Sequence, residues 1–163
     1  MEAFLIIRVR AAAAGDYERI CELMDTVDSL HFDRLPDIYR RPAEPARTRS
    51  WFESVLRDRN QCLRVAEIDG RAAGYIHGTI RETPPDPVLV PRRFAKLDGM
   101  GVDERYRRRG TGRMLLDALR RWAEERGADS LELNVHDFNR GAMEFYRAEG
   151  FDDFRHLMKK PLR

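Results

Sequence analysis

The sequence is organised around residues 94–116, which read Phe-Ala-Lys-Leu-Asp-Gly-Met-Gly-Val-Asp-Glu-Arg-Tyr-Arg-Arg-Arg-Gly-Thr-Gly-Arg-Met-Leu-Leu. The pattern predicts a strand that ends near Val102, a short turn, and a helix that begins at the glycines. Gly110 and Gly112 carry no side chain, so the backbone there can approach a ligand closely. The first turn of a helix has N–H groups without intrahelical partners and the positive end of the helix dipole. This turn is therefore predicted to bind an anion.

Four arginines add positive charge around the turn, namely Arg107, Arg108, Arg109 and Arg113. Phosphate is the expected anion, because helix amides and guanidinium groups both bind it. A P-loop is excluded, since no Lys-Ser or Lys-Thr pair follows the glycines. The dinucleotide fingerprint Gly-x-Gly-x-x-Gly is excluded as well, since position 115 is leucine. The alternative to a phosphate site is a basic helix start that binds no ligand.

Length and composition favour one globular domain over residues 1–163. The 30 Lys and Arg residues are balanced by 28 Asp and Glu residues, so overall charge gives no argument for nucleic-acid binding. Cys21 and Cys62 do not form a Cys-x-x-Cys pair, and no zinc or redox site is expected. No segment reads as a membrane span or a signal peptide, so we expect a cytoplasmic protein without a metal.

The rest of the chain alternates between strand and helix patterns. Apolar residues at helical spacing predict helices over residues 17–30, 46–58, 111–126 and 139–149. Alternating or β-rich runs predict strands over residues 4–10, 61–69, 71–81, 93–102, 130–136 and 151–159. Asp16 is the predicted N-cap of the first helix, and Asp69-Gly70 predicts a hairpin. Prolines indicate a linker over residues 31–42 and a loop over residues 83–91. This order predicts an α/β fold with a mixed sheet.

A second motif lies downstream of the glycine turn. Asn139, Ala142, Tyr146, Gly150 and Phe151 follow the spacing Asn-x-x-Ala-x-x-x-Tyr-x-x-x-Gly-Phe. Together with Arg-Arg-Arg-Gly-Thr-Gly, which is similar to the pyrophosphate loop Gln/Arg-x-x-Gly-x-Gly/Ala, this motif resembles the two linked signatures of the GNAT family of N-acetyltransferases. The two signatures occur in the family's order, with one helix and one strand between them.

The resemblance implies the GNAT fold, in which about four helices flank a mixed central sheet of six to seven strands. The strands predicted over 93–102 and 130–136 should run parallel and splay apart at the acyl-CoA site. Backbone groups exposed in that gap would hold the pantetheine arm of acetyl-CoA. The residues that the resemblance assigns to this co-substrate are Met100, Val102, Arg107, Arg108, Arg109, Gly110, Thr111, Gly112, Arg113, Asn139, Ala142 and Tyr146.

The resemblance also implies a reaction, the transfer of acetyl from acetyl-CoA to a primary amine by direct attack in a ternary complex. The leaving thiolate needs a proton, and Tyr146 is the expected general acid. A backbone N–H such as that of Val102 could stabilise the oxyanion. The alternatives are that Tyr146 is only a buried aromatic residue and that Asn139 is only a helix cap, although a cap can also contact the cofactor.

The general base is left open by the sequence. The position at which some family members carry a catalytic glutamate falls on Lys96, which could act only with a greatly lowered pKa. Asp98 is the first candidate, because it lies beside Gly99, where a bulge could redirect its carboxylate. Ordered water alone is another possibility. The remaining candidates are His77, His136, Glu67 and Glu132.

The acceptor amine is also open, and it could belong to a small molecule, a peptide N-terminus or a lysine. Four carboxylates near the expected acceptor side hint at a cationic acceptor, or form an ordinary solvated surface: Asp25, Asp28, Asp33 and Asp37. A non-catalytic acyl-CoA sensor of the same fold is the alternative function. A nucleic-acid binder that uses the arginines is a third class, but aromatic interleaving is absent. A homodimer is compatible with the family.

Overall fold

The structure is a computed structural model that describes residues 6–163. Its helices are α1 (Tyr17–Arg34), α2 (Arg49–Arg57), α3 (Thr111–Glu125) and α4 (Arg140–Ala148). Its strands are β1 (Ile7–Ala11), β2 (Gln61–Ile68), β3 (Arg71–Glu82), β4 (Arg93–Val102) and β5 (Leu131–Leu133). Two short 3-10 turns are η1 (Ala14–Asp16) and η2 (Glu104–Tyr106). The chain up to Leu133 and the chain from Asn134 onward form two compact units.

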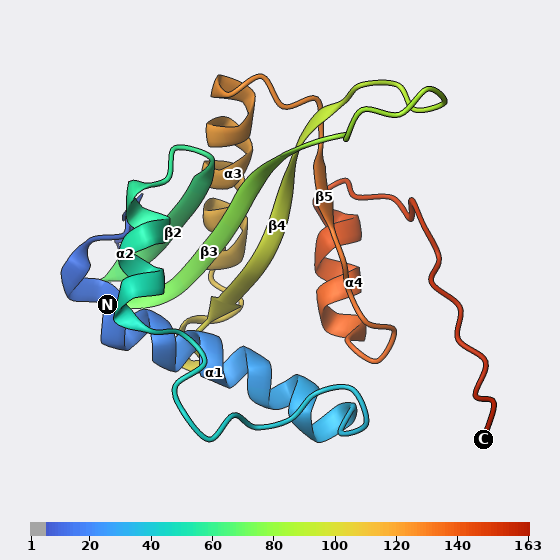
Figure 1. Ribbon diagram of the computed structural model, residues 1–163. Helices are drawn as coiled ribbons and strands as arrows, with labels where there is room; N and C mark the ends of the chain where they lie inside the picture. The colour runs from blue at the N-terminus through green and yellow to red at the C-terminus, as the bar shows by residue number, and fades with distance from the viewer. Residues whose placement is uncertain (1–5) are drawn as a thin grey trace. The chain divides into compact units, whose positions relative to one another are not determined.

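The first unit is built on one sheet with the strand order β1-β2-β3-β4-β5 (Figure 1). The pairs β1–β2, β2–β3 and β3–β4 are antiparallel, whereas β5 runs parallel to β4. Helix α3 packs on one face of the sheet, and α1 and α2 pack on the other (Figure 1). The hairpin between β2 and β3 turns at Asp69 and Gly70, which both have positive φ angles, as a two-residue turn of this type requires. The predicted mixed α/β fold is confirmed.

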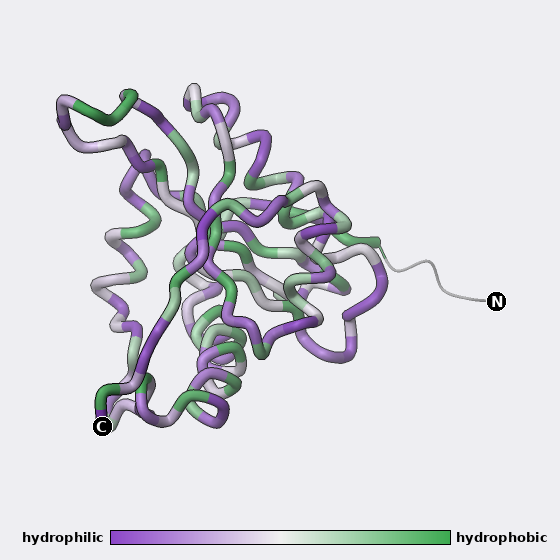
Figure 2. Tube along the Cα trace, turned by 90° about the vertical axis from the view of Figure 1, so that its right-hand side faces the viewer, coloured by the Kyte–Doolittle hydropathy of each residue, from purple (hydrophilic) through white to green (hydrophobic). Residues whose placement is uncertain are grey.

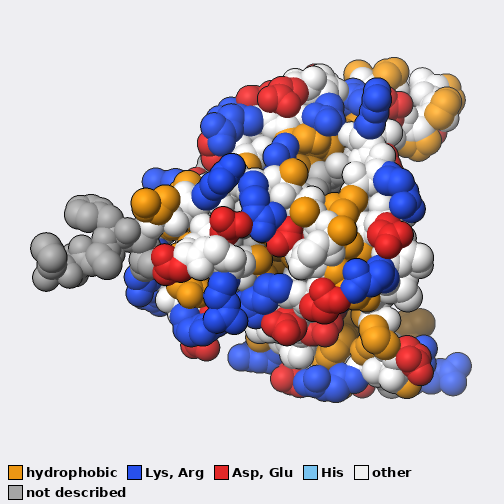
Figure 3. Space-filling model, turned by 90° about the vertical axis from the view of Figure 1, so that its left-hand side faces the viewer, with side chains coloured by type: hydrophobic (Ala, Val, Ile, Leu, Met, Phe, Trp, Pro, Cys, Tyr) orange, Lys and Arg blue, Asp and Glu red, His pale blue; other side chains and the backbone are white. Residues whose placement is uncertain are grey.

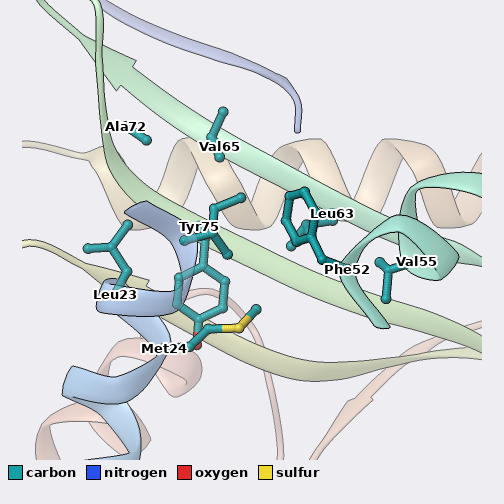
Figure 4. Packing of buried hydrophobic residues seen from close by; sticks show 9 residues of the cluster. Leu23, Met24, Phe52, Val55, Leu63, Val65, Ala72 and Tyr75 are labelled. Atoms are coloured by element: carbon teal, nitrogen blue, oxygen red, sulfur yellow. The ribbon is translucent and has the colours of Figure 1, made fainter. Parts of the chain in front are cut away.

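A hydrophobic core lies between the sheet and helices α1 and α2. The ring of Tyr75 on β3 extends toward Leu23 and Met24 of α1, while Phe52 of α2 lies beside Leu63 of β2 (Figure 4). All five side chains are buried, and the Phe52 ring is completely so. Burial of each such side chain contributes roughly 1.5–3 kcal/mol, which fixes the two helices on this face of the sheet.

Glycines in the central strands allow close packing on both faces. A Cβ at Gly101 of β4 would lie 2.9 Å from the Tyr75 ring and 2.9 Å from Val27 of α1. On the other face, a Cβ at Gly78 of β3 would lie 2.6 Å from the Leu119 side chain of α3. The absence of side chains at these positions therefore lets Tyr75 and α3 approach the sheet.

Several predicted boundaries differ from the structure at the N-terminal end. Helix α1 continues to Arg34, so the first part of the predicted linker 31–42 is helical. Asp16 precedes α1 but does not cap it with its side chain. Its carboxylate instead accepts from the Arg10 guanidinium and from the Ala13 N–H at 2.8 Å. The predicted strand 4–10 begins at Ile7, and its residues up to 5 lie outside the described part of the chain.

The last predicted strand is not formed. Residues 151–163 have no regular secondary structure, and the described sheet has five strands instead of six to seven. The preceding strand is also shorter than the predicted 130–136. The physical reason is that a strand requires a neighbour for its backbone hydrogen bonds, so a suitable side-chain pattern alone is insufficient. Among residues 6–163, none of the helices has the length and apolar character needed to cross a membrane.

Candidate functional site

The predicted anion turn lies between β4 and α3. Gly110 is the N-cap residue of α3 and has a φ angle of 80°, in the left-handed region that glycine adopts without Cβ strain. A Cβ built at Gly110 would meet no atom within 4 Å. The Met114 N–H donates to the Gly110 carbonyl at 3.0 Å. The amides of Thr111 and Gly112 precede this bond in the helix, and they are therefore oriented to receive an anion.

Arg108 adds a second left-handed residue to the turn, with a φ angle of 59°. The Thr111 side chain stabilises the turn, since it is 1% exposed and its hydroxyl donates to the Tyr106 carbonyl at 3.1 Å. Thr111 can therefore offer a ligand its backbone but not its hydroxyl.

Arg107 connects the turn to the end of β4. Its Nε donates to the Val102 carbonyl at 3.0 Å, and its amide donates to the Glu104 carbonyl at 3.3 Å. Arg107 therefore stabilises the turn through these two hydrogen bonds. Its direct contact with a cofactor stays a prediction. Arg109 is exposed beside Gly110, where its guanidinium adds positive charge to the turn.

Asp103 begins the turn and was not identified from the sequence. Its carboxylate accepts from the Arg105 side chain at 2.8 Å, from the Arg105 N–H at 3.1 Å, and from Arg19 of α1. These bonds, with that of the Arg105 guanidinium first, hold the pKa of the Asp103 carboxyl well below its usual range. An Asp two residues before an Arg at a strand end was the available signal, because such a carboxylate can cap the next turn.

Strand β4 has an open edge beyond its pairing with β5. The parallel pairing covers β4 residues 95–97 and ends at Leu133, whereas β4 continues to Val102. Residues 98–102 are therefore paired only with β3 among the described strands. This arrangement is the one expected for two parallel strands that separate.

The hydrogen-bond pattern shows which backbone groups point to that edge. The Asp103 N–H donates to the Ala73 carbonyl at 2.8 Å, so Val102 and Gly74 form a pair that is not hydrogen-bonded to each other. The N–H and C=O of Val102 therefore point away from β3. The same holds for Met100, two residues earlier on the strand. The two residues predicted to hold pantetheine are those whose backbone groups face the open edge.

Asp98 lies where the open edge begins. His77 pairs with Gly99 and the next pair is Gly78 with Leu97, so Asp98 is the extra residue of a β-bulge. The predicted bulge beside Gly99 is therefore present. The Asp98 side chain is exposed to solvent, and bulges of this kind are frequent beside active sites because they redirect a side chain.

A polar cluster lies on the face of the sheet to which the Asp98 side chain points, and its other members are Gln61, His77 and Thr79. The Thr79 hydroxyl donates to the Asp98 carboxylate. The His77 Nε2 lies 2.9 Å from the Gln61 Oε1, and its ring meets Trp51 edge-on at 6.0 Å between centroids. Burial lowers the pKa of His77, which favours its neutral form. The cluster thus contains two groups that can accept a proton, the Asp98 carboxylate and the His77 imidazole.

The other candidate bases have different surroundings. Glu67 accepts from the Arg10 guanidinium at 2.7 Å, and Glu132 accepts from Arg92. Both carboxylates are already engaged by a cation. In the second unit, the His136 ring stacks on Phe138 at 5.7 Å between centroids.

The acidic cluster proposed from the sequence is largely matched by arginines. Asp28 pairs with Arg47, Asp25 lies 3.8 Å from the same guanidinium, and Asp33 lies 3.6 Å from Arg41. These paired carboxylates therefore do not favour a cationic acceptor. Basic and acidic side chains are interspersed on the face seen in Figure 3. Within residues 6–163, His, Cys, Asp and Glu do not gather into a group of three or more that suits a metal.

The second unit contains the downstream motif. The Asn139 side chain accepts from the Ala142 N–H at 3.2 Å, so Asn139 caps α4. The Tyr146 ring lies 5.3 Å from the Phe145 ring and 5.5 Å from the Phe151 ring. Burial raises the pKa of Tyr146 to about 12, so its phenol keeps its proton at neutral pH. The motif therefore builds a capped helix that holds a protonated phenol.

Sequence relatives of the chain are N-acetyltransferases. A match to the Acetyltransferase (GNAT) family covers residues 24–151. The L-2,4-diaminobutyric acid acetyltransferase of Nocardia farcinica is 32% identical over 60% of this chain and 47% of that protein. The uncharacterized N-acetyltransferase MJ1207 of Methanocaldococcus jannaschii is 28% identical over 64% of this chain and 45% of that protein. The chain thus spans about half the length of these two relatives.

Solved structures extend the comparison to almost the whole chain. A mutant of the BH1408 protein from Bacillus halodurans is 28% identical, with a TM-score of 0.88 over 97% of this chain and 99% of that chain. The aminoglycoside N-acetyltransferase AAC(6')-Iy, solved with a bisubstrate analogue, shares the fold at 19% identity, with a TM-score of 0.75 over 97% of this chain and 99% of that chain. The family match and the shared fold agree with the glycine turn and the open β4 edge, and we conclude that the chain belongs to the Acetyltransferase (GNAT) family.

Proposed function

We propose that this protein transfers an acetyl group from acetyl-CoA to a primary amine. The observation that carries the proposal is the continuity of two backbone features within the first unit. The open edge of β4 ends at Val102, and the anion turn at Gly110 follows directly after η2. An extended pantetheine arm would bind the edge as an added strand does, and its diphosphate would bind the amides of the turn.

We assign the groups that the reaction needs to Asp98 and Val102 of the first unit and to Tyr146 of the second unit. Only a neutral amine can attack the thioester carbonyl, so the acceptor's ammonium group must first lose a proton. We propose that Asp98 accepts this proton. The Val102 N–H, which points to the open edge, is the proposed donor to the oxyanion. Tyr146 is the proposed proton donor to the departing thiolate, a role that its raised pKa permits at neutral pH.

The names of the relatives support an amine acceptor without defining it. One relative is named for L-2,4-diaminobutyric acid, and another, from Sulfurisphaera tokodaii, is named an N-alpha-acetyltransferase. The acceptor panel should therefore contain amino acids with a side-chain amine, peptides with a free N-terminus, lysine peptides and aminoglycosides.

Release of free CoA from acetyl-CoA, followed with a thiol reagent, tests the proposal. At least one amine class should raise CoA release above the rate without amine. Tyr146→Phe should lower kcat by about 10²-fold, as expected for loss of one general acid, and should leave acetyl-CoA affinity unchanged. Affinity can be measured separately by calorimetry. If acetyl-CoA binds and every amine leaves the release rate at background, the protein is a non-catalytic acyl-CoA sensor.

A further inference from the structure

A chain of hydrogen bonds connects the Asp58 carboxylate, through the Gln61 side chain, to the His77 ring. Asp58 follows the last residue of α2, Gln61 begins β2, and His77 lies on β3. Gln61 Nε2 lies 3.1 Å from Asp58 Oδ2, and Gln61 Oε1 lies 2.9 Å from His77 Nε2. His77 lies between two buried residues of β3, and Figure 2 shows hydrophilic and hydrophobic residues following one another along the chain. The hydrogen bonds thus join an exposed carboxylate to a half-buried imidazole.

The Asp58 carboxylate decides the orientation of the Gln61 amide. The Asn60 N–H donates to Asp58 Oδ1 at 2.8 Å, and this bond, followed by that of Gln61, lowers the pKa of Asp58. An ionised carboxylate only accepts hydrogen bonds, so the Gln61 NH₂ group must face Asp58, and the Gln61 side-chain carbonyl must face His77. Because that carbonyl can only accept, His77 Nε2 is the donor of the second bond.

His77 is therefore held as the tautomer that carries its proton on Nε2 and a lone pair on Nδ1. Burial lowers the pKa of His77 and favours the neutral ring. The negative charge of Asp98 on β4 opposes this effect, whereas the positive charges of Arg47 and Arg81 add to it. Trp51 of α2, which meets the ring edge-on, is uncharged.

The Nδ1 atom of His77 is accessible from solvent. Among residues 6–163, His77 makes its side-chain hydrogen bond through Nε2 and none through Nδ1. Every buried side-chain nitrogen and oxygen of these residues has a hydrogen-bond partner, so Nδ1 is not one of the buried atoms. His77 also shares a face of the sheet with Asp98, since the Thr79 hydroxyl, two residues along β3, donates to the Asp98 carboxylate.

We propose that His77 Nδ1 accepts a hydrogen bond from the acceptor amine, and that Gln61 and Asp58 are positioning residues that keep this lone pair free for it. This role rests on the proposed function, in which Asp98 accepts the proton of the same amine. A primary ammonium group has three N–H bonds, so it can donate one to Asp98 and another to Nδ1. Two acceptors on neighbouring strands fix the direction of the amine before it attacks. A tertiary amine, whose ammonium form has one N–H, cannot satisfy both acceptors.

Long-range nitrogen–hydrogen NMR of the CoA-bound protein tests this hydrogen bond without turnover. The His77 resonances, identified by their absence in His77→Asn, should show a protonated Nε2 and an unprotonated Nδ1 at neutral pH. L-Lysine, a peptide with a free N-terminus and kanamycin are then added separately, with tetramethylammonium as a control cation that has no N–H. At least one of the three amines should shift the Nδ1 resonance, and tetramethylammonium should not. A protonated Nδ1 in the protein without amine would overturn the proposal.

Comparison with CoA release from acetyl-CoA separates this proposal from the proposed function. An amine that is acetylated but leaves the Nδ1 resonance unmoved would contradict the hydrogen bond to His77 and leave the acetyltransferase activity standing. An amine that shifts Nδ1 and is not acetylated would support the hydrogen bond and contradict the activity. If none of the three amines shifts Nδ1 or raises CoA release, both are wrong.

Two substitutions at position 77 distinguish this role from a purely structural one. Asparagine and leucine have the same branching, but only His77→Asn keeps an acceptor at the δ position, where Nδ1 lies. The kcat/KM for an acetylated amine should be about tenfold higher in His77→Asn than in His77→Leu, the effect of one hydrogen bond to a charged group. The KM for acetyl-CoA should be equal in the two variants. Equal kcat/KM values for the amine would overturn the proposal.

Substitutions at Gln61 test the positioning role and leave His77 itself intact. The ammonium group of Gln61→Lys can only donate to Nε2, so NMR should find the proton on Nδ1, and the shift caused by the amine should disappear. Gln61→Met has a side chain of similar length without a donor at that position, and its Nδ1 should stay unprotonated. An unprotonated Nδ1 in Gln61→Lys would show that Gln61 does not set the tautomer.

Discussion

The substitution Gly110→Ala separates a ligand effect from a stability effect. Gly110 has a φ angle of 80°, and an alanine in this left-handed region costs about 1–2 kcal/mol. No atom lies within 4 Å of the added Cβ, so steric overlap adds nothing to this cost. For a chain of this size, the loss corresponds to a decrease in Tm of about 2–8 °C. The same methyl group would project into open space at the N-terminal end of α3, where we propose that the diphosphate binds.

Gly127→Ala provides a matched control on the same helix. Gly127 follows the C-terminal end of α3, has a φ angle of 69°, and likewise has no atom within 4 Å of a built Cβ. Both variants should therefore lose similar stability. Gly110→Ala alone should also weaken acetyl-CoA binding by about tenfold, or about 1.4 kcal/mol, which is in the range of one hydrogen bond to a charged group.

Thermal unfolding gives the two Tm values, and calorimetry with acetyl-CoA or CoA gives the two dissociation constants. Gly110→Ala should differ from Gly127→Ala in the second measurement and resemble it in the first. Equal CoA affinity in the two variants would refute the assignment of the glycine turn to the diphosphate. A large stability difference between them would refute the estimate of backbone strain.

Three further predictions follow from single contacts. Asp98→Asn keeps a side chain of the same shape but removes the proton acceptor, so kcat should fall about 10²-fold while the KM for acetyl-CoA stays unchanged. An unchanged kcat would show that water or another side chain accepts the proton. Because the pKa of Asp103 is lowered in the folded state, its stabilising effect is present above its usual pKa and is lost as the pH falls below it. Urea unfolding of Asp103→Asn should therefore show a smaller loss of stability than the native protein between about pH 5 and about pH 2, and equal losses would contradict this. Gly78→Ala should cost about 1–3 kcal/mol because its Cβ would lie 2.6 Å from Leu119, and an unchanged urea midpoint would show that α3 can shift.

Local signals explain which elements the sequence predicted well. The limits of β4 agree with the predicted strand 93–102, because prolines precede it and the glycine turn follows it. The hairpin at Asp69-Gly70 and the four helices likewise depend on turn residues and on apolar spacing within a few residues. The conformation of the glycine turn belongs to this group, since Gly110 is both the N-cap of α3 and a left-handed residue.

Features that depend on distant residues were harder to predict. Strict alternation along β4 would place Asp98 and Gly99 on opposite faces, yet both lie on the side of the sheet that carries Thr79 and Tyr75. Gly99 indicated where a bulge could form, and the pairing with β3 shows that Asp98 is its extra residue. Asp28 of α1 forms an ion pair with Arg47, which lies in the segment before α2. Composition alone could not show that this carboxylate has a basic partner.

The bulge at Asp98 has a consequence for how this site can vary. The pairs His77–Gly99 and Gly78–Leu97 are consecutive on β3, so the parts of β4 before and after Asp98 keep one common register with β3. Deleting this single codon would join two segments whose register already agrees, and no later residue of β4 would change face. A carboxylate can therefore be gained or lost here as a one-residue insertion or deletion, while the open edge at Met100 and Val102 keeps its orientation.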